Sequence, residues 1–148
     1  MLNPVPESYL YDPPTEPWLE LLHEDDRILV FDNGISRPHV SMPHSRILEI
    51  DPLTRRIEWQ YADTPGYAFF TPFMGGAQRL HNGNTLITEA NFGRLFEVTP
   101  AGEVVWEYIN PHFAAYPDAA SRRYLPGENN AIFRAHRYQR DDIPWLRG

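Results

Sequence analysis

The feature that most constrains the fold is an order of short segments that occurs twice along the chain of 148 residues. Each copy contains a His-bearing turn, an Arg-led hydrophobic stretch and a Trp followed closely by a Tyr. The corresponding segments are Leu22–Val30 and Leu80–Thr88, Ser45–Pro52 and Gly93–Pro100, and Ile57–Tyr61 and Val105–Tyr108. Self-similarity on this scale is typical of architectures built from repeated units, so it decides the fold class before any single motif does.

Each copy has the residue pattern of several short β-strands. In the second copy we predict strands over 77–80, 85–89, 94–98 and 103–108, separated by turns that contain Asn, Gly and Pro. Four antiparallel strands in about 35 residues, with a Trp near the end, describe one blade of a β-propeller. We expect Trp59 and Trp106 to fill the space between neighbouring blades. The predicted fold class is all-β: a partial β-propeller of about two four-stranded antiparallel blades plus the initial strand of a third.

The repeat also divides the chain. We predict an extended Pro-rich segment over 1–20, a blade over 21–61, a second blade over 68–109, a connecting insertion over 110–128 with a short helical turn at 119–123, a closing strand over 130–138 and a tail over 139–148. Two blades and one strand do not close a propeller, which needs at least about four blades. We therefore expect either that the chain is a piece of a longer protein or that several copies assemble into a ring.

Composition excludes several classes of function. A net charge of −7 argues against binding nucleic acid through phosphate contacts. There is no Cys, which excludes disulfides and thiolate nucleophiles, and no Lys, which excludes Schiff-base chemistry. We recognise no signal peptide and no apolar stretch of the roughly 18–20 residues that span a membrane, and the compartment stays open. No spacing indicates a metal site, and no phosphate loop or Ser-His-Asp signature is present.

Several motifs, taken in order, resemble the C-terminal part of bacterial arylsulfotransferase-family proteins. They are Val30–Gly34, Ser45–Asp51, Ile57–Tyr61, Phe69–Phe73, Gln78–Thr88 and Phe133–Tyr138. The resemblance runs from about Leu21 to Tyr138. It implies a six-bladed propeller with the active site in its central channel. It also implies transfer of a sulfuryl group from a phenolic sulfate ester to another phenol, through a sulfohistidine and without a nucleotide sulfate donor.

The resemblance also implies candidate site residues. The family has an arginine three positions after the glycine of Asp-Asn-Gly, which here is Arg37. The position expected to hold the nucleophilic histidine carries Arg94, which cannot act as a nucleophile. His136 lies on a strand expected to line the channel, and His44 lies near Arg37 in the loop that follows it. The predictions are Arg37 and His136 as catalytic residues and Arg94 and His44 as substrate-binding residues.

Alternatives remain open from the sequence. Arg37 is also consistent with a loop arginine that pairs with an acid, and His136 with a packed structural histidine. The chain as a whole is also consistent with a non-catalytic propeller module for binding or assembly. A quinone-cofactor dehydrogenase is weaker, because no acidic cluster suggests its calcium site. We expect an aryl sulfate or a phenol as ligand, no cofactor, and self-association or further blades as partners.

Overall fold

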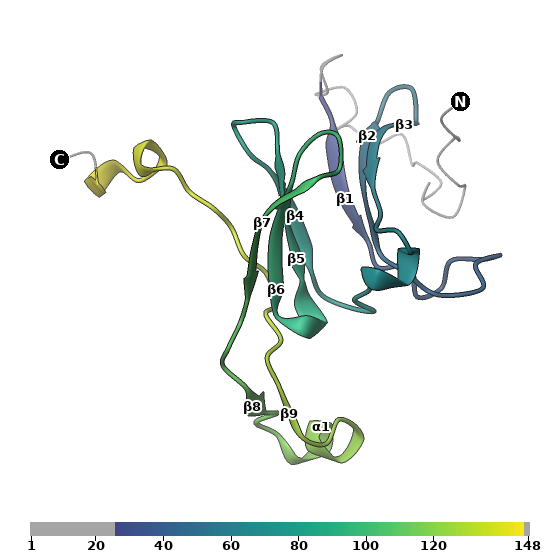
Figure 1. The fold of residues 1–148 in the computed structure, drawn as a ribbon, viewed down its shortest axis with the longest axis vertical. Helices are drawn as coiled ribbons and strands as arrows, with labels where there is room; N and C mark the ends of the chain where they lie inside the picture. Colours follow the sequence, from purple (N-terminus) through teal and green to yellow (C-terminus); the bar gives the residue numbers. More distant parts are fainter. Residues whose placement is uncertain (1–25, 147–148) are drawn as a thin grey trace.

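A computed structural model of the chain describes residues 26–146. Two antiparallel sheets, each with its strands in chain order, make up the body of the molecule (Figure 1). The first sheet contains β1 (Ile28–Asp32), β2 (Arg46–Asp51) and β3 (Arg56–Tyr61). The second contains β4 (Gly76–Arg79), β5 (Thr85–Glu89), β6 (Arg94–Val98) and β7 (Val104–Ile109).

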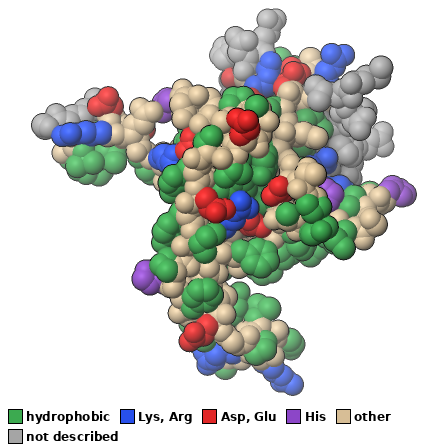
Figure 2. All heavy atoms as spheres, viewed as in Figure 1, with side chains coloured by type: hydrophobic (Ala, Val, Ile, Leu, Met, Phe, Trp, Pro, Cys, Tyr) green, Lys and Arg blue, Asp and Glu red, His purple; other side chains and the backbone are tan. Residues whose placement is uncertain are grey.

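A smaller projection extends from one end of the second sheet (Figure 1). It contains the two-stranded sheet of β8 (Ala114–Ala115) and β9 (Glu128–Asn129), with helix α1 (Ala119–Tyr124) between them. The Asp118 carboxylate caps α1 by accepting a hydrogen bond from the Ser121 backbone N–H at 2.7 Å. The helix lies where the sequence predicts a helical turn. Figure 2 shows hydrophobic side chains on the surface of this projection, where Phe113 and Tyr124 are exposed.

Short 3-10 turns occupy the connections. They are η3 (Gly66–Ala68), η4 (Ala90–Phe92), η5 (Arg140–Asp142) and η6 (Pro144–Leu146). In the described part of the chain, no helix is long and apolar enough to cross a membrane.

The all-β prediction is confirmed, since open antiparallel sheets dominate residues 26–146, as a partial β-propeller requires. The second sheet has the four strands expected for a blade. The described part of the first sheet has three strands where four are expected for the blade over 21–61. Residues 21–25 of that blade and the predicted extended segment over 1–20 lie outside the described residues.

The two sheets share details beyond strand count. The register between the second and third strands of the first sheet shifts between Glu49 and Ile50, and the corresponding register in the second sheet shifts between Glu97 and Val98. In both sheets the Glu before the shift lies opposite the Trp: Glu49 opposite Trp59, and Glu97 opposite Trp106. The register therefore shifts at corresponding points of the two sheets, as a β-bulge of one extra residue produces.

The main hydrophobic core lies between the two sheets. Ile47 and Tyr61 of the first sheet pack with Ile87 and Phe96 of the second, and Phe69 from the linking segment completes the cluster. The rings of Phe69 and Phe96 meet edge to face with centroids 5.5 Å apart, a favourable arrangement for aromatic quadrupoles. Burial raises the pKa of the Tyr61 hydroxyl to about 12. The sheets are therefore held together by apolar packing, as stacked blades would be.

Residues 130–138, where the sequence predicts a strand, follow the second sheet without forming a ladder with it. The Ala135 backbone N–H donates to the Thr88 hydroxyl at 3.1 Å, and the Arg137 N–H donates to the Gln78 side-chain oxygen at 2.7 Å. The Gln78 amide nitrogen donates in return to the Arg137 carbonyl at 2.9 Å. The segment also makes two isolated backbone hydrogen bonds, from the Ile132 N–H to the Ala90 carbonyl at 3.0 Å and from the Gly75 N–H to the Phe133 carbonyl at 3.2 Å. Because side chains and isolated backbone bonds together satisfy this backbone, the segment lies against the sheet without adding a strand to it.

Candidate functional site

Arg37 lies in a cluster of charged residues at the end of β1. Asp32, the last residue of β1, is buried, and its carboxylate accepts hydrogen bonds at 2.7 Å from Arg37 Nη2 and from Arg46 Nε. The Gly34 N–H donates to the other carboxylate oxygen at 3.0 Å. Two guanidinium groups thus share one carboxylate. The side chain of Arg37 is only 10% exposed, and its buried Nε has no hydrogen-bond partner within residues 26–146.

His44 joins this cluster from the other end of the same loop. Arg37 Nη1 donates to His44 Nε2 at 2.9 Å, and Arg37 Nη2 donates to the His44 carbonyl at 3.1 Å. An arginine can only donate, so His44 Nε2 accepts and the ring is neutral with its proton on Nδ1, which faces the Met42 carbonyl at 3.1 Å. The Nε2 lone pair of His44 is therefore already used by Arg37. This arrangement suits His44 to holding Arg37 in place better than to attacking an electrophile.

The loop that carries Arg37 is tied to the second sheet by a polar network. The Asn33 amide donates to the Thr71 and Met74 carbonyls at 2.7 and 2.9 Å. The Thr71 backbone N–H donates to the buried Ser45 hydroxyl, and the Thr71 hydroxyl donates to Asn91 in η4 at 2.7 Å. Each buried polar group in this chain of contacts has a partner, which gives the loop one arrangement relative to both sheets.

Arg94 begins β6 at the corresponding end of the second sheet. Its Nε donates to Glu107 at 2.5 Å, its Nη1 donates to Glu89 at 3.2 Å, and the guanidinium lies 4.1 Å from the centroid of the Phe96 ring. Burial raises the pKa of Glu89, although hydrogen bonds from Phe70 and Arg94 oppose that rise. Burial disfavours the charged form of Arg94, but the hydrogen bonds of Glu107 and Glu89 outweigh it, so the pKa of Arg94 is raised. Two carboxylates already neutralise this guanidinium.

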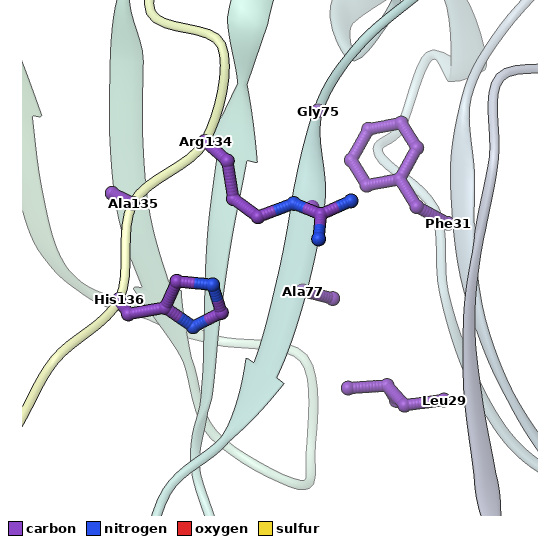
Figure 3. A pocket seen from close by; sticks show the side chains of 8 residues that line it. Leu29, Phe31, Gly75, Ala77, Arg134, Ala135 and His136 are labelled. Carbon is purple, nitrogen blue, oxygen red and sulfur yellow. The ribbon is translucent and has the colours of Figure 1, made fainter.

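A pocket of about 170 Å³ opens between the two sheets and residues 134–136. The first sheet contributes Leu29 and Phe31 of β1, and the second contributes backbone and small side chains at residues 75–77 (Figure 3). Arg134 and His136 extend from the segment 134–136 toward β4 and β1, as Figure 3 shows. One wall of the pocket is apolar and the opposite wall carries a guanidinium and an imidazole.

His136 is an accessible imidazole in this pocket. It is exposed, and neither ring nitrogen has a hydrogen-bond partner among the residues that the structure describes. Its ring contacts Tyr138, with centroids 6.4 Å apart. His136 therefore differs from His44, whose Nε2 is engaged by Arg37.

The structure brings Arg37 and His44 together. Arg94 lies apart from them between Glu89 and Glu107, and His136 lies in the pocket. Phe31, which lines the pocket, and Asp32, which binds Arg37, are consecutive residues of β1. The sequence reasoning did not select Arg134. The signal for it was the pattern Arg134-Ala135-His136, since two residues at i and i+2 in an extended segment lie on the same side.

The chemistry available in these surroundings is anion binding and nucleophilic attack by an imidazole. Within residues 26–146, no group of three or more His, Cys, Asp or Glu side chains is placed to hold a metal ion.

Comparison with protein families gives a match over most of the chain. The model of a family described as "Arylsulfotransferase (ASST)" matches residues 8–111. The predicted resemblance is thereby confirmed over both sheets, although the match ends before residues 112–138, which the predicted resemblance included. Searches of curated proteins and of solved structures found no match.

Proposed function

Because the chain belongs to the arylsulfotransferase family, we propose that it forms blades of a propeller that transfers a sulfuryl group from an aryl sulfate to a phenol. The nucleophile in this proposal is His136. The observation that carries it is the exposed imidazole of His136, which has no hydrogen-bond partner within residues 26–146 and faces a pocket shared with a guanidinium. A neutral imidazole with an available lone pair is the form that attacks sulfur.

The proposed reaction has two steps. A ring nitrogen of His136 forms a bond to sulfur, the bond between sulfur and the aryl oxygen breaks, and the phenol leaves as its phenolate. The oxygen of the acceptor phenol then attacks the same sulfur, its proton passes to solvent, and the imidazole is released with its original electron pair. The covalent intermediate splits one difficult transfer into two easier ones.

Arg37 is the proposed stabiliser of the charge that develops in both steps. Its guanidinium is nearly buried, and its Nε retains a hydrogen that no residue in 26–146 accepts. His44 supports this role by accepting from Arg37 Nη1 and keeping the guanidinium oriented. Preorganised donors of this kind lower the barrier because they need no rearrangement during the reaction.

The experiment is turnover of 4-nitrophenyl sulfate with phenol as acceptor, followed by the absorbance of released 4-nitrophenolate. His136→Ala is expected to lower the rate by about 100-fold or more, because loss of a nucleophile removes the covalent route. His112→Ala is the matched control, since His112 is an exposed histidine in the segment that connects the second sheet to β8. A chain that releases no 4-nitrophenolate even at high protein concentration would exclude the catalytic proposal for this chain.

The second candidate function is a non-catalytic module for binding or assembly. It is favoured by Arg94, which occupies the position where the resemblance places the nucleophile and whose charge two carboxylates already balance. Under this candidate, 4-nitrophenyl sulfate binds without being cleaved. We therefore leave Arg94 out of the proposed catalytic set.

We also propose that further blades, from a longer chain or from other copies, complete the ring. The outer strand β7 supports this proposal, because Trp106 and Tyr108 are each 41% exposed although their counterparts in β3 contact the second sheet.

A further inference from the structure

Arg134 is an exposed arginine that lines the pocket, and no carboxylate within residues 26–146 forms an ion pair with it. Its near neighbour in sequence, Arg137, forms an ion pair with Glu97, and Arg79 on β4 forms one with Glu49. No hydrogen bond or ion pair joins Arg134 to any residue in 26–146. An arginine presents five donors in a rigid fork, so this side chain has its full capacity for an oxyanion available.

The sequence around the pocket makes room for this side chain. A Cβ at Gly76 would lie 3.2 Å from both Cγ and Nε of Arg134, so glycine at this position allows the arginine to lie against the strand. A Cβ at Gly75 would lie 2.9 Å from the Phe31 ring, and Gly75 also has a φ of +98° that favours glycine. The two adjacent glycines, Gly75 just before β4 and Gly76 at its first position, thus let the Phe31 ring of β1 and the Arg134 side chain lie close to the backbone.

The pocket has the two-part character that an aromatic anion requires. Leu29 and Phe31 present apolar surface on one side, and Arg134 crosses toward them from the other side (Figure 3). None of the residues that line the pocket is a carboxylate, so nothing in its lining competes with an incoming anion. Phe31 itself is held by an edge-to-face contact with the buried Phe69 at 5.7 Å, which orients its ring.

We propose that Arg134 binds the sulfuryl oxygens of an aryl sulfate while Phe31 and Leu29 contact its ring, and that this contact selects aryl over alkyl sulfates. His136 then lies on the same wall as the anion, two residues along the segment. The choice of a sulfate ester as ligand rests on the proposed function. The binding site itself does not require turnover.

The test is equilibrium binding of 4-nitrophenyl sulfate to the full chain, measured by calorimetry. Arg134→Met keeps the apolar arm of the side chain over Gly76 and removes the charge, and it is expected to weaken binding by about 10-fold or more. Arg123→Met is the matched control because Arg123 is an exposed arginine of helix α1 and the net charge changes equally. This control is expected to stay within about twofold of the unmodified protein.

Two further measurements keep the proposal falsifiable. Arg134→Lys keeps the charge but loses the planar fork, so we expect it to bind 4-nitrophenyl sulfate more weakly than the unmodified protein does. This comparison does not depend on whether Arg134→Met folds. Phe31→Leu keeps apolar packing against Phe69 but removes the ring, so the preference for 4-nitrophenyl sulfate over hexyl sulfate is expected to fall.

Failure of this inference is distinct from failure of the proposed function. Equal binding by Arg134→Met and the unmodified protein overturns the inference, as does an equal loss in Arg123→Met or the absence of any binding. If binding depends on Arg134 but no 4-nitrophenolate is released, the inference stands and the catalytic proposal fails. If turnover depends on His136 but Arg134→Met binds as tightly as the unmodified protein, the catalytic proposal stands and the inference about Arg134 fails.

Discussion

The two sheets carry the same set of contacts on one face, but within residues 26–146 only the first has that face covered by another sheet. In the first sheet, Trp59 Nε1 donates to the Pro100 carbonyl of the second sheet at 2.8 Å, and Tyr61 is only 6% exposed. In the second sheet, the corresponding Trp106 and Tyr108 are each 41% exposed. The difference shows that burial of this face depends on its neighbour, as expected where each unit contacts only the next one.

A charged contact accompanies each Trp. Arg79 forms an ion pair with Glu49 and lies 4.5 Å from the centroid of Trp59, and Arg137 forms an ion pair with Glu97 and lies 4.7 Å from Trp106. In both cases the arginine belongs to the segment that follows in the chain. Arg137 in residues 134–137 therefore makes the same ion pair and ring contact with the second sheet that Arg79 of β4 makes with the first. The first sheet is contacted by a strand of a whole sheet, and the second by a single segment.

The largest expected effect is a difference between the two tyrosines. Tyr61→Ala removes a buried ring that packs with Phe69 and Phe96, so it should lower the free energy of unfolding by about 3–5 kcal/mol. Tyr108→Ala removes a half-exposed ring and should cost about 1 kcal/mol. Urea unfolding of the two variants measures both values. Equal large losses would mean that another copy already covers β7 in solution, as the proposed ring of several copies requires, and the difference in burial between the two sheets would then not hold in the assembled protein.

A smaller effect is expected from the arginines that bridge consecutive units. Arg79→Ala should lower the free energy of unfolding by about 1 kcal/mol, because a partly exposed ion pair and a cation–π contact each contribute a fraction of that value. Arg137→Ala should cost a similar amount, since it makes the same two contacts. Double-mutant cycles with Glu49 and Glu97 measure each coupling, and Arg56→Ala, at an exposed position, is the control. A coupling found at only one of the two sites would show that the contacts are not equivalent.

The smallest expected effect concerns pH. Hydrogen bonds from Asn84 and Asn82, together with Arg137, lower the pKa of Glu97 despite its burial. A carboxyl whose pKa is lower in the folded state stabilises the fold above its unfolded pKa of about 4.3, and this contribution is lost as pH falls through the folded value. Glu97→Gln should therefore lose less stability than the unmodified protein on acidification from about pH 5 to pH 3. Thermal unfolding across this range tests it, and an unchanged acid dependence would contradict it.

Part of the fold and of the site follows from local sequence. Turns that contain Asn82-Gly83 and Pro100-Ala101-Gly102 separate strands of the second sheet, and its four strands lie within a residue or two of the predicted ranges. Alternating hydrophobic residues and turn residues act over a few positions, so their consequences are readable without the rest of the molecule. The short helix after Asp118 follows from a cap of the same local kind.

Other features depended on residues far apart in sequence. The segment 130–138 has the composition of a strand, yet part of its backbone is bonded to the side chains of Thr88 and Gln78, which lie 47 and 59 positions before their partners. Nor did the sequence distinguish the surroundings of the four predicted site residues. Arg94 meets two carboxylates, Arg37 shares one carboxylate with Arg46, and His44 accepts from Arg37.

The amino-acid sequence by itself determined the strands of the second sheet, their turns and the family, because propensity, periodicity and motif order are local or linear properties. Only the tertiary structure decided which charged groups are already neutralised and which remain available, because a charge is balanced by whatever the fold places within a few ångströms of it. Gly75 and Gly76, at the start of β4, show the same division. Their identity is in the sequence, but the reason for two glycines appears only in the structure, where Phe31 of β1 and Arg134 pack against them and line one pocket.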